Sequence, residues 1–184
     1  MSENSSENSN VMLKNVRLSF PSLFQTEKFG QEDTGKFAGT FILNKKEHAK
    51  TIERLEEKVQ EGFKKLKVKS LPAARICLKD GDESGREEYE GAYVIKATTK
   101  KRPTVIDRDR TPLAEEDGKP YSGCYVNAII NFWFQDNQFG KRVNANLLGV
   151  QFVKDGEAFG SGPVDVSDEF EVLEEAYTDE NELF

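Results

Sequence analysis

A chain of 184 residues predicts one domain, with disordered ends, that is long enough to bury a core without disulfides or metal. Cys77 and Cys124 have no close partner, and His48 is the only histidine, so we expect no metal site, no cofactor and free thiols in a reducing compartment. Residues 1–10 contain no apolar run, which argues against a secretory signal or membrane span. We therefore expect a soluble, intracellular protein.

The net charge of −7 is unevenly distributed along the chain. Residues 1–164 carry 26 basic and 24 acidic residues, which makes the body of the protein mildly basic. The segment after Pro163 has no Lys or Arg, and its nine acidic residues are Asp165, Asp168, Glu169, Glu171, Glu174, Glu175, Asp179, Glu180 and Glu182. The asymmetry indicates a cationic domain followed by an anionic tail.

The first part of the chain predicts two strands. Residues 1–10 are a Ser/Asn/Glu run that cannot bury apolar surface and is expected to be disordered. Residues 11–20 have the pattern of a strand that ends at Pro21. A loop is expected over 22–35, and a second strand over 36–43.

A helix is predicted over about 45–68. Asn44 has the side chain of an N-cap, and Glu47 completes a capping-box pattern. Apolar residues recur at helical spacing on one face: Ala49, Ile52, Leu55, Val59, Phe63 and Leu66. The helix ends in a basic run, Lys64, Lys65, Lys67 and Lys69, which indicates either a solvated end favoured by the helix dipole or a phosphate contact.

A short strand is predicted over 73–78, ahead of an acidic cluster at Asp80, Asp82 and Glu83. Carboxylates that lie this close together suggest a cation. The cluster lacks the spacing of a calcium loop and has no histidine nearby, so we interpret it as a turn.

The strand expected over 89–99 has apolar residues on both faces, so periodicity leaves open whether Tyr93 points inward or outward. The densest basic stretch follows, with Lys100, Lys101, Arg102, Arg108 and Arg110. Two interpretations remain open for it, a solvated loop and a contact with a nucleic-acid backbone. Residues 111–122 are expected to form an acidic loop.

Residues 123–152 predict a hairpin of two strands joined by a turn over 135–142. The even positions of the first strand are apolar and should face a core: Val126, Ala128, Ile130, Phe132 and Phe134. The odd positions make a mixed outer face: Tyr125, Asn127, Ile129, Asn131 and Trp133. Aromatic rings beside cations are what an unpaired nucleic-acid strand requires, because bases stack on the rings and phosphates meet positive charge.

Six or seven short strands and one helix predict a mostly β protein. The expected fold is an OB-fold-like antiparallel barrel with one packed α-helix, because that barrel presents a strand face to oligonucleotides. The predicted organisation is a disordered arm over 1–10, the OB-fold domain over 11–163 and an acidic disordered tail over 164–184.

The tail ends in Leu183 and Phe184. A tethered polyanion competes with nucleic acid for the same cationic surface, and a terminal ring with a carboxylate suits a basic-rimmed pocket on a partner protein. A purely solubilising tail is the alternative.

Several pieces of the sequence, in this order, resemble the bacteriophage single-stranded-DNA-binding proteins with an OB fold: VRLSFPSLF, KFAGTFILNK, LKDGDE, KRPTVID, YSGCYVNAIINFW and GKRVNANLLGVQFVKDGEAFG. The acidic tail with its last Phe184 is similar to the tail of that family. The resemblance implies a non-enzymatic protein of the bacterial host cytoplasm that coats single strands in phage DNA replication or recombination. It also implies recruitment of phage or host replication proteins through the tail.

On this reading the expected DNA-binding residues are Tyr93, Lys96, Lys100, Lys101, Arg102, Tyr125, Trp133, Phe139, Lys141 and Arg142. The expected partner-binding residues are Asp179, Glu180, Glu182, Leu183 and Phe184. Two other hypotheses remain: an adaptor that does not bind DNA, and a metal-dependent nuclease that uses Asp80, Asp82, Glu83 and Asp107. The sequence leaves open whether the protein is a monomer or a dimer.

Overall fold

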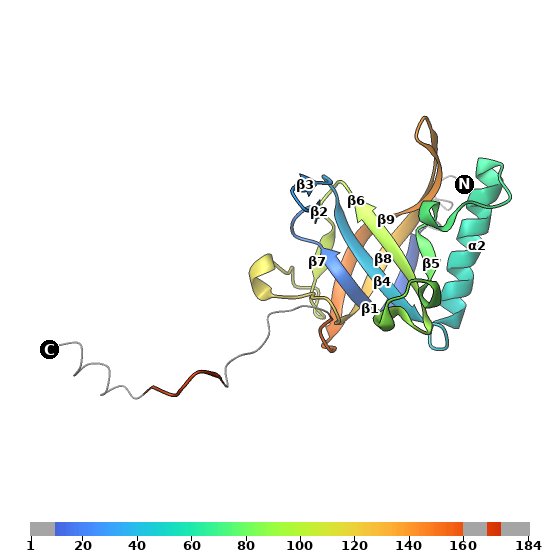
Figure 1. The fold of residues 1–184 in the computed structure, drawn as a ribbon. Coiled ribbons are helices and arrows are strands. Elements are labelled where there is room, and N and C mark those ends of the chain that lie inside the picture. Colours follow the sequence, from blue (N-terminus) through green and yellow to red (C-terminus); the bar gives the residue numbers. More distant parts are fainter. Residues whose placement is uncertain (1–9, 160–168, 174–184) are drawn as a thin grey trace.

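The computed structural model describes residues 10–159 and 169–173. Five strands curl into a closed barrel (Figure 1): β1 (Asn10–Ser22), β4 (Phe37–Asn44), β6 (Ala92–Thr99), β8 (Tyr125–Asn137) and β9 (Gly140–Lys154). They are ordered β6-β4-β1-β8-β9 with antiparallel neighbours, and a parallel pairing of Thr98 with Asn146 joins β6 to β9 and closes the barrel. The predicted mostly β barrel is confirmed.

Shorter elements extend this barrel. β5 (Leu78–Asp80) pairs with β6, and β7 (Thr104–Ile106) pairs with β9. β7 lies inside the basic stretch that was expected to be a loop. The connection between β1 and β4, also expected to be a plain loop, carries a small hairpin of β2 (Lys28–Phe29) and β3 (Glu32–Asp33).

Four 3-10 turns complete the described elements: η1 (Ala73–Arg75), η2 (Gly81–Glu83), η3 (Glu87–Tyr89) and η4 (Glu115–Asp117). The strand predicted over 73–78 is therefore wrong, since a turn occupies its first half and β5 begins only at Leu78. The acidic cluster does form a turn, η2, as predicted.

The alternation predicted for the first strand of the hairpin is present in β8. Val126, Ala128 and Ile130 are fully buried in the core, while Phe132 and Phe134 are partly buried and pack against it. The turn is shorter than the predicted 135–142, because pairing continues to Asn137 and resumes at Gly140. The tip therefore consists of two residues, Gln138 and Phe139.

The helix, α2 (Ala49–Leu66), lies against one side of the barrel (Figure 1). The residues of the predicted apolar face that are buried are Ile52, Leu55, Val59, Phe63 and Leu66. Gly62 lets the ring of Phe134 come close to the helix, because a Cβ there would lie 2.6 Å from a ring carbon.

The predicted start of this helix is wrong. The Asn44 side chain accepts hydrogen bonds from the backbone N–H groups of Lys46 and Glu47, at 2.8 and 3.1 Å. These bonds stabilise a turn after β4, and the helix begins only at Ala49, behind His48. The pattern of a capping box thus marks the turn that precedes the helix.

Both cysteines are free, as expected. Burial raises the pKa of Cys124 to about 11 and that of Cys77 to about 12, so both thiols stay protonated at neutral pH. None of the helices in the described part of the chain combines the length and the apolar character needed to cross a membrane. The predicted disorder of the ends stays a prediction, although Asn10 already pairs with Asn131 in the barrel.

Candidate nucleic-acid interface

A basic hollow of about 560 Å³ lies on the outer face of the barrel, where β4, β6 and β9 meet the segment from η1 to β5. It exists because β6 alternates: Ile95 and Ala97 are buried in the core, whereas Lys96 and Thr98 line the hollow. The lining cations come from widely separated parts of the chain and are Lys36, Arg75, Lys79, Arg86, Lys96 and Arg142. Among the described residues, no Asp or Glu lines it.

A second hollow of about 460 Å³ adjoins the first, because Lys36 and Thr98 line both. Its other lining residues include Lys100, Lys101 and Trp133. The Trp133 side chain points outward from β8, as its odd position predicts, and it is 39% exposed. The two hollows together form what we call the basic groove, a cationic surface with an indole ring at one end.

The groove brings together five of the residues predicted to contact DNA, namely Lys96, Lys100, Lys101, Trp133 and Arg142. The others do not line it, and they are Tyr93, Arg102, Tyr125, Phe139 and Lys141. The tail residues predicted to bind a partner, Asp179, Glu180, Glu182, Leu183 and Phe184, lie outside the described residues. All of these binding roles stay predictions.

Tyr93 points inward, which answers the question that periodicity left open. Its ring is partly buried against the core, and the Lys45 ammonium lies 5.2 Å from the ring centre. Desolvation, followed by the nearby Glu56 carboxylate, raises the pKa of the Tyr93 hydroxyl. The side chain is therefore on the other side of β6 from the groove.

Tyr125 lies at the opposite end of β8 from Trp133. The two residues are eight positions apart, which at about 3.3 Å per residue is roughly 26 Å. The Tyr125 ring contacts other cations, with the Lys154 ammonium at 4.8 Å and the Arg17 guanidinium at 5.8 Å from its centre. One DNA strand would have to extend well beyond the groove to reach it.

The tip of the β8–β9 hairpin is attached to the end of α2. The Lys141 ammonium donates a hydrogen bond to the Leu66 carbonyl at 2.6 Å, and Arg75 donates to the Phe139 and Lys141 carbonyls, both at 3.4 Å. The Phe139 side chain itself is 71% exposed. Arg102 is exposed on its loop, 5.7 Å from the Phe24 ring.

Sequence reasoning missed four of the cations in the groove: Lys36, Arg75, Lys79 and Arg86. Each stands outside the dense basic stretches, so no local run of charge marks it. The pairing of β4 with β6, and of β5 with β6, brings Lys36 and Lys79 to one surface, and the turns next to these strands carry Arg75 and Arg86.

Two exposed aromatic residues beside the groove were also missed. Phe20 is 48% exposed, has a φ of +44° that non-glycine residues rarely adopt, and lies with its ring 5.3 Å from the Arg86 guanidinium. Phe29, in β2, is 63% exposed and lies 5.5 Å from the Lys96 ammonium. A signal was available for Phe29, since an aromatic residue in a polar, glycine-containing loop has no core to enter.

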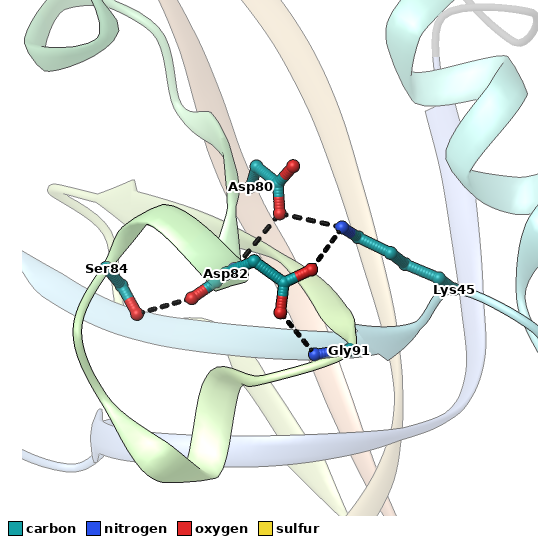
Figure 2. A network of polar contacts seen from close by, with 6 residues as sticks. Lys45, Asp80, Asp82, Ser84 and Gly91 are labelled. Carbon is teal, nitrogen blue, oxygen red and sulfur yellow. Dashed lines mark hydrogen bonds and ion pairs between the residues drawn. The ribbon is translucent and has the colours of Figure 1, made fainter.

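The acidic turn is held by one lysine, as Figure 2 shows. The Lys45 ammonium lies 2.9 Å from the Asp80 carboxylate and 2.6 Å from that of Asp82. Asp82 also accepts a hydrogen bond from the Gly91 N–H at 2.8 Å. The contact with Lys45 lowers the pKa of Asp80, the Gly91 N–H followed by Lys45 lowers that of Asp82, and the two carboxylates raise the pKa of Lys45.

Three of the four carboxylates that the nuclease hypothesis uses, Asp80, Asp82 and Asp107, are thus engaged in ion pairs. Asp107 pairs with Lys119 at 3.1 Å, and not with the lysine that holds Asp80 and Asp82. The described residues contain no group of three or more His, Cys, Asp or Glu side chains with the geometry to hold a metal ion. The arrangement of these residues favours a turn that stabilises the fold.

Comparison with known proteins identifies the family. Residues 9–183 match the family model described as the Enterobacter phage Enc34 ssDNA-binding protein. Putative protein p50 of Acyrthosiphon pisum secondary endosymbiont phage 1 is 38% identical, over 92% of this chain and 97% of that protein.

Solved structures give the same result. The single-stranded DNA-binding protein of bacteriophage Enc34 in complex with ssDNA is similar with a TM-score of 0.75 and 33% identity, over 84% of this chain and 91% of that chain. The single-stranded DNA-binding protein encoded by bacteriophage T7 shares only the fold, with a TM-score of 0.50 and 14% identity over 88% of this chain and 96% of that one. These matches confirm the OB-fold barrel, and the chain belongs to the Enc34 family of phage single-stranded-DNA-binding proteins.

Proposed function

We propose that this protein binds single-stranded DNA without sequence preference and protects it during phage DNA replication or recombination. The observation that carries the proposal is the basic groove, in which cations from separate chain segments line one surface that ends at the exposed Trp133. Membership of the Enc34 family supports it, because the Enc34 protein has been solved in complex with ssDNA. We assign the protein no catalytic step.

In this proposal phosphates meet the lysine and arginine side chains of the groove, and a base stacks on Trp133. Each phosphate neutralised should contribute about −0.7 to the slope of log affinity against log salt concentration. Stacking should contribute about 1–3 kcal/mol per base with little sequence preference, because every base has a π face.

The acidic tail is proposed to compete with DNA for the groove. The described residues before it end at Phe159, whose ring lies 4.1 Å from the Arg17 guanidinium and whose N–H donates to the Ser122 carbonyl at 3.1 Å. Phe159 packs against a cluster that includes Tyr89 and Val94, and both of these also line the groove. Phe159 therefore lies beside the groove, and a competitor joined to it by a short flexible connection would have an effective concentration of millimolar order.

The same tail is proposed to recruit phage or host replication and recombination proteins. Its terminal Leu183 and Phe184 supply an apolar anchor, and the acids before them suit a basic-rimmed pocket. When DNA occupies the groove, the tail is released and becomes available to such a partner.

A titration of oligo-dT, followed through the fluorescence of the single tryptophan at two salt concentrations, tests the proposal. We expect quenching of Trp133 and an affinity that falls with salt. No quenching and no binding at low salt would favour an adaptor that only displays the tail. Loss of a labelled oligonucleotide that depends on magnesium would instead favour a nuclease.

A further inference from the structure

A carboxylate of the β1–β4 connection, that of Glu27, forms an ion pair with one cation of the basic groove, Lys96. Both oxygens of Glu27 accept hydrogen bonds from the Lys96 ammonium, at 3.0 and 2.9 Å. The Glu27 side chain is only 18% exposed, so this is a partly sheltered pair. The one other ion pair of a groove cation in the described part of the chain is looser, between Arg86 and Glu88 at 3.5 Å.

The backbone holds Glu27 in this place. Its N–H donates to the Lys36 carbonyl at 2.7 Å, and its own carbonyl accepts from the Thr34 N–H at 2.9 Å. These bonds close the base of the β2–β3 hairpin, which Figure 1 shows at one rim of the barrel. The Glu27 backbone is thus held next to Lys36, which lines both hollows, and its carboxylate reaches Lys96, which lines the first.

The same hairpin carries an aromatic ring that contributes nothing to the core. Phe29 is 63% exposed, and its ring centre lies 5.5 Å from the Lys96 ammonium. A ring open to solvent beside a cation of the groove has the two parts that a nucleotide needs, a stacking face and a phosphate contact.

We infer that Phe29 and Lys96 form a nucleotide subsite, and that Glu27 occupies its phosphate position as an internal mimic until DNA displaces it. This inference rests on the proposed function, and it adds Glu27 and Phe29 to the DNA-binding residues expected from the sequence. On binding, a DNA phosphate replaces the Glu27 carboxylate on Lys96, and the carboxylate returns to water with its own counterion. The exchange lowers affinity and salt dependence, because the release of a cation from DNA is offset by uptake of a cation at Glu27.

The central experiment compares E27Q with E32Q in the full-length chain. Glu32 is a matched control, since it is an exposed acid of the same hairpin with no contact to Lys96. We expect E27Q to tighten binding of oligo-dT about threefold to tenfold at low salt and to steepen the salt slope by up to about 0.7. E32Q should change the affinity less than about twofold, because the Glu32 charge that it removes is exposed and screened. Equal effects of the two substitutions, or weaker binding by E27Q, would overturn the inference.

A second pair of variants tests the ring. F29L should lose about fivefold or more in affinity, because a leucine offers no stacking face. F29Y keeps an aromatic ring at the same position and should therefore retain most of the affinity. An F29L variant that folds normally and keeps full affinity would also refute the subsite.

A failure of the proposed subsite can be distinguished from a failure of the proposed function. Quenching of Trp133 by oligo-dT in the unmodified protein supports that function regardless of Glu27 and Phe29. If the unmodified protein binds with quenching while E27Q behaves as E32Q does, only the subsite is rejected. If the unmodified protein does not bind at low salt, the proposed function is rejected and the subsite with it.

Discussion

The ammonium of Lys141 donates a 2.6 Å hydrogen bond to the carbonyl oxygen of Leu66, the last residue of α2. A helix leaves its final carbonyls without partners inside the helix, so this side chain satisfies one of them and complements the helix dipole. The lysine that the sequence assigned to phosphate thus connects the β8–β9 hairpin to the helix.

Replacing Lys141 by Met should therefore lower stability more than DNA binding. A charge-assisted bond at a partly buried site is worth about 1–2 kcal/mol, so denaturant unfolding should show a loss of that order. The salt slope of oligo-dT binding should stay unchanged. If the slope instead falls by about 0.7 while stability is kept, Lys141 contacts a phosphate after all.

Trp133→Ala should weaken binding of single-stranded DNA by about 1–3 kcal/mol, because one stacking face disappears. Trp133→Phe should retain most of the affinity while losing the fluorescence signal, so competition against a labelled oligonucleotide is the suitable measurement. Tyr125→Ala is the control, since that ring lies at the far end of β8. A loss with Tyr125→Ala equal to that with Trp133→Ala would place DNA along the whole strand.

Lys36→Gln should make the salt slope shallower by about 0.7, because this side chain lines both hollows and neutralises a phosphate in our proposal. Lys50→Gln removes the same charge from an exposed position on α2 and should leave the slope unchanged. The measurement is the affinity of each variant for oligo-dT across a salt series, from which the two slopes are compared. Equal slopes for the two variants would contradict the assignment of the groove.

Deleting residues 164–184 should tighten binding of single-stranded DNA several-fold at low salt, because a tethered competitor is removed. The gain should shrink as salt is added, since screening weakens the contact between tail and groove. A tail of the same length with its Asp and Glu changed to Asn and Gln is the matched control and should behave as the deletion does. Unchanged affinity in both variants would reject competition by the tail.

The Lys45 network predicts how stability depends on acid. Asp80 and Asp82 have lowered pKa values in the folded protein, so their contribution is present above the unfolded value of about 3.9 and is lost as the pH falls through the folded values. The thermal midpoint should therefore drop as the pH falls below about 4. In a Lys45→Met variant this part of the drop should be smaller, and an unchanged acid profile would show that the network contributes nothing.

The sequence was most informative about which side chains are buried within a single strand or a single helix. The alternation in β8 correctly separated buried Val126, Ala128 and Ile130 from outward-facing Trp133, because a strand turns successive side chains to opposite faces. The buried face of α2 followed from its spacing in the same way. The general barrel class followed from the number of strands and from the family resemblance.

The groove was harder to predict, because it depends on which strands become neighbours. Lys36, Lys79 and Arg86 stand outside the dense basic stretches, and only the β4–β6 and β5–β6 pairings and the adjacent turns bring them together. Tyr93 was ambiguous because Val94, on the opposite face of β6, is also buried, with Phe159 packed against its cluster. A strand covered on both faces gives no alternation from which to assign a direction.

The barrel is closed by a single registered residue pair, Thr98 opposite Asn146, and both residues line the hollow that contains Trp133. The strand pairing with the fewest registered residues in the barrel therefore lies in the groove proposed to bind DNA. A nucleic-acid strand that lies there would contact both β6 and β9 from outside the barrel and so add contacts across the closure. Bound DNA would then stabilise the closed barrel, so that protein and DNA would protect each other.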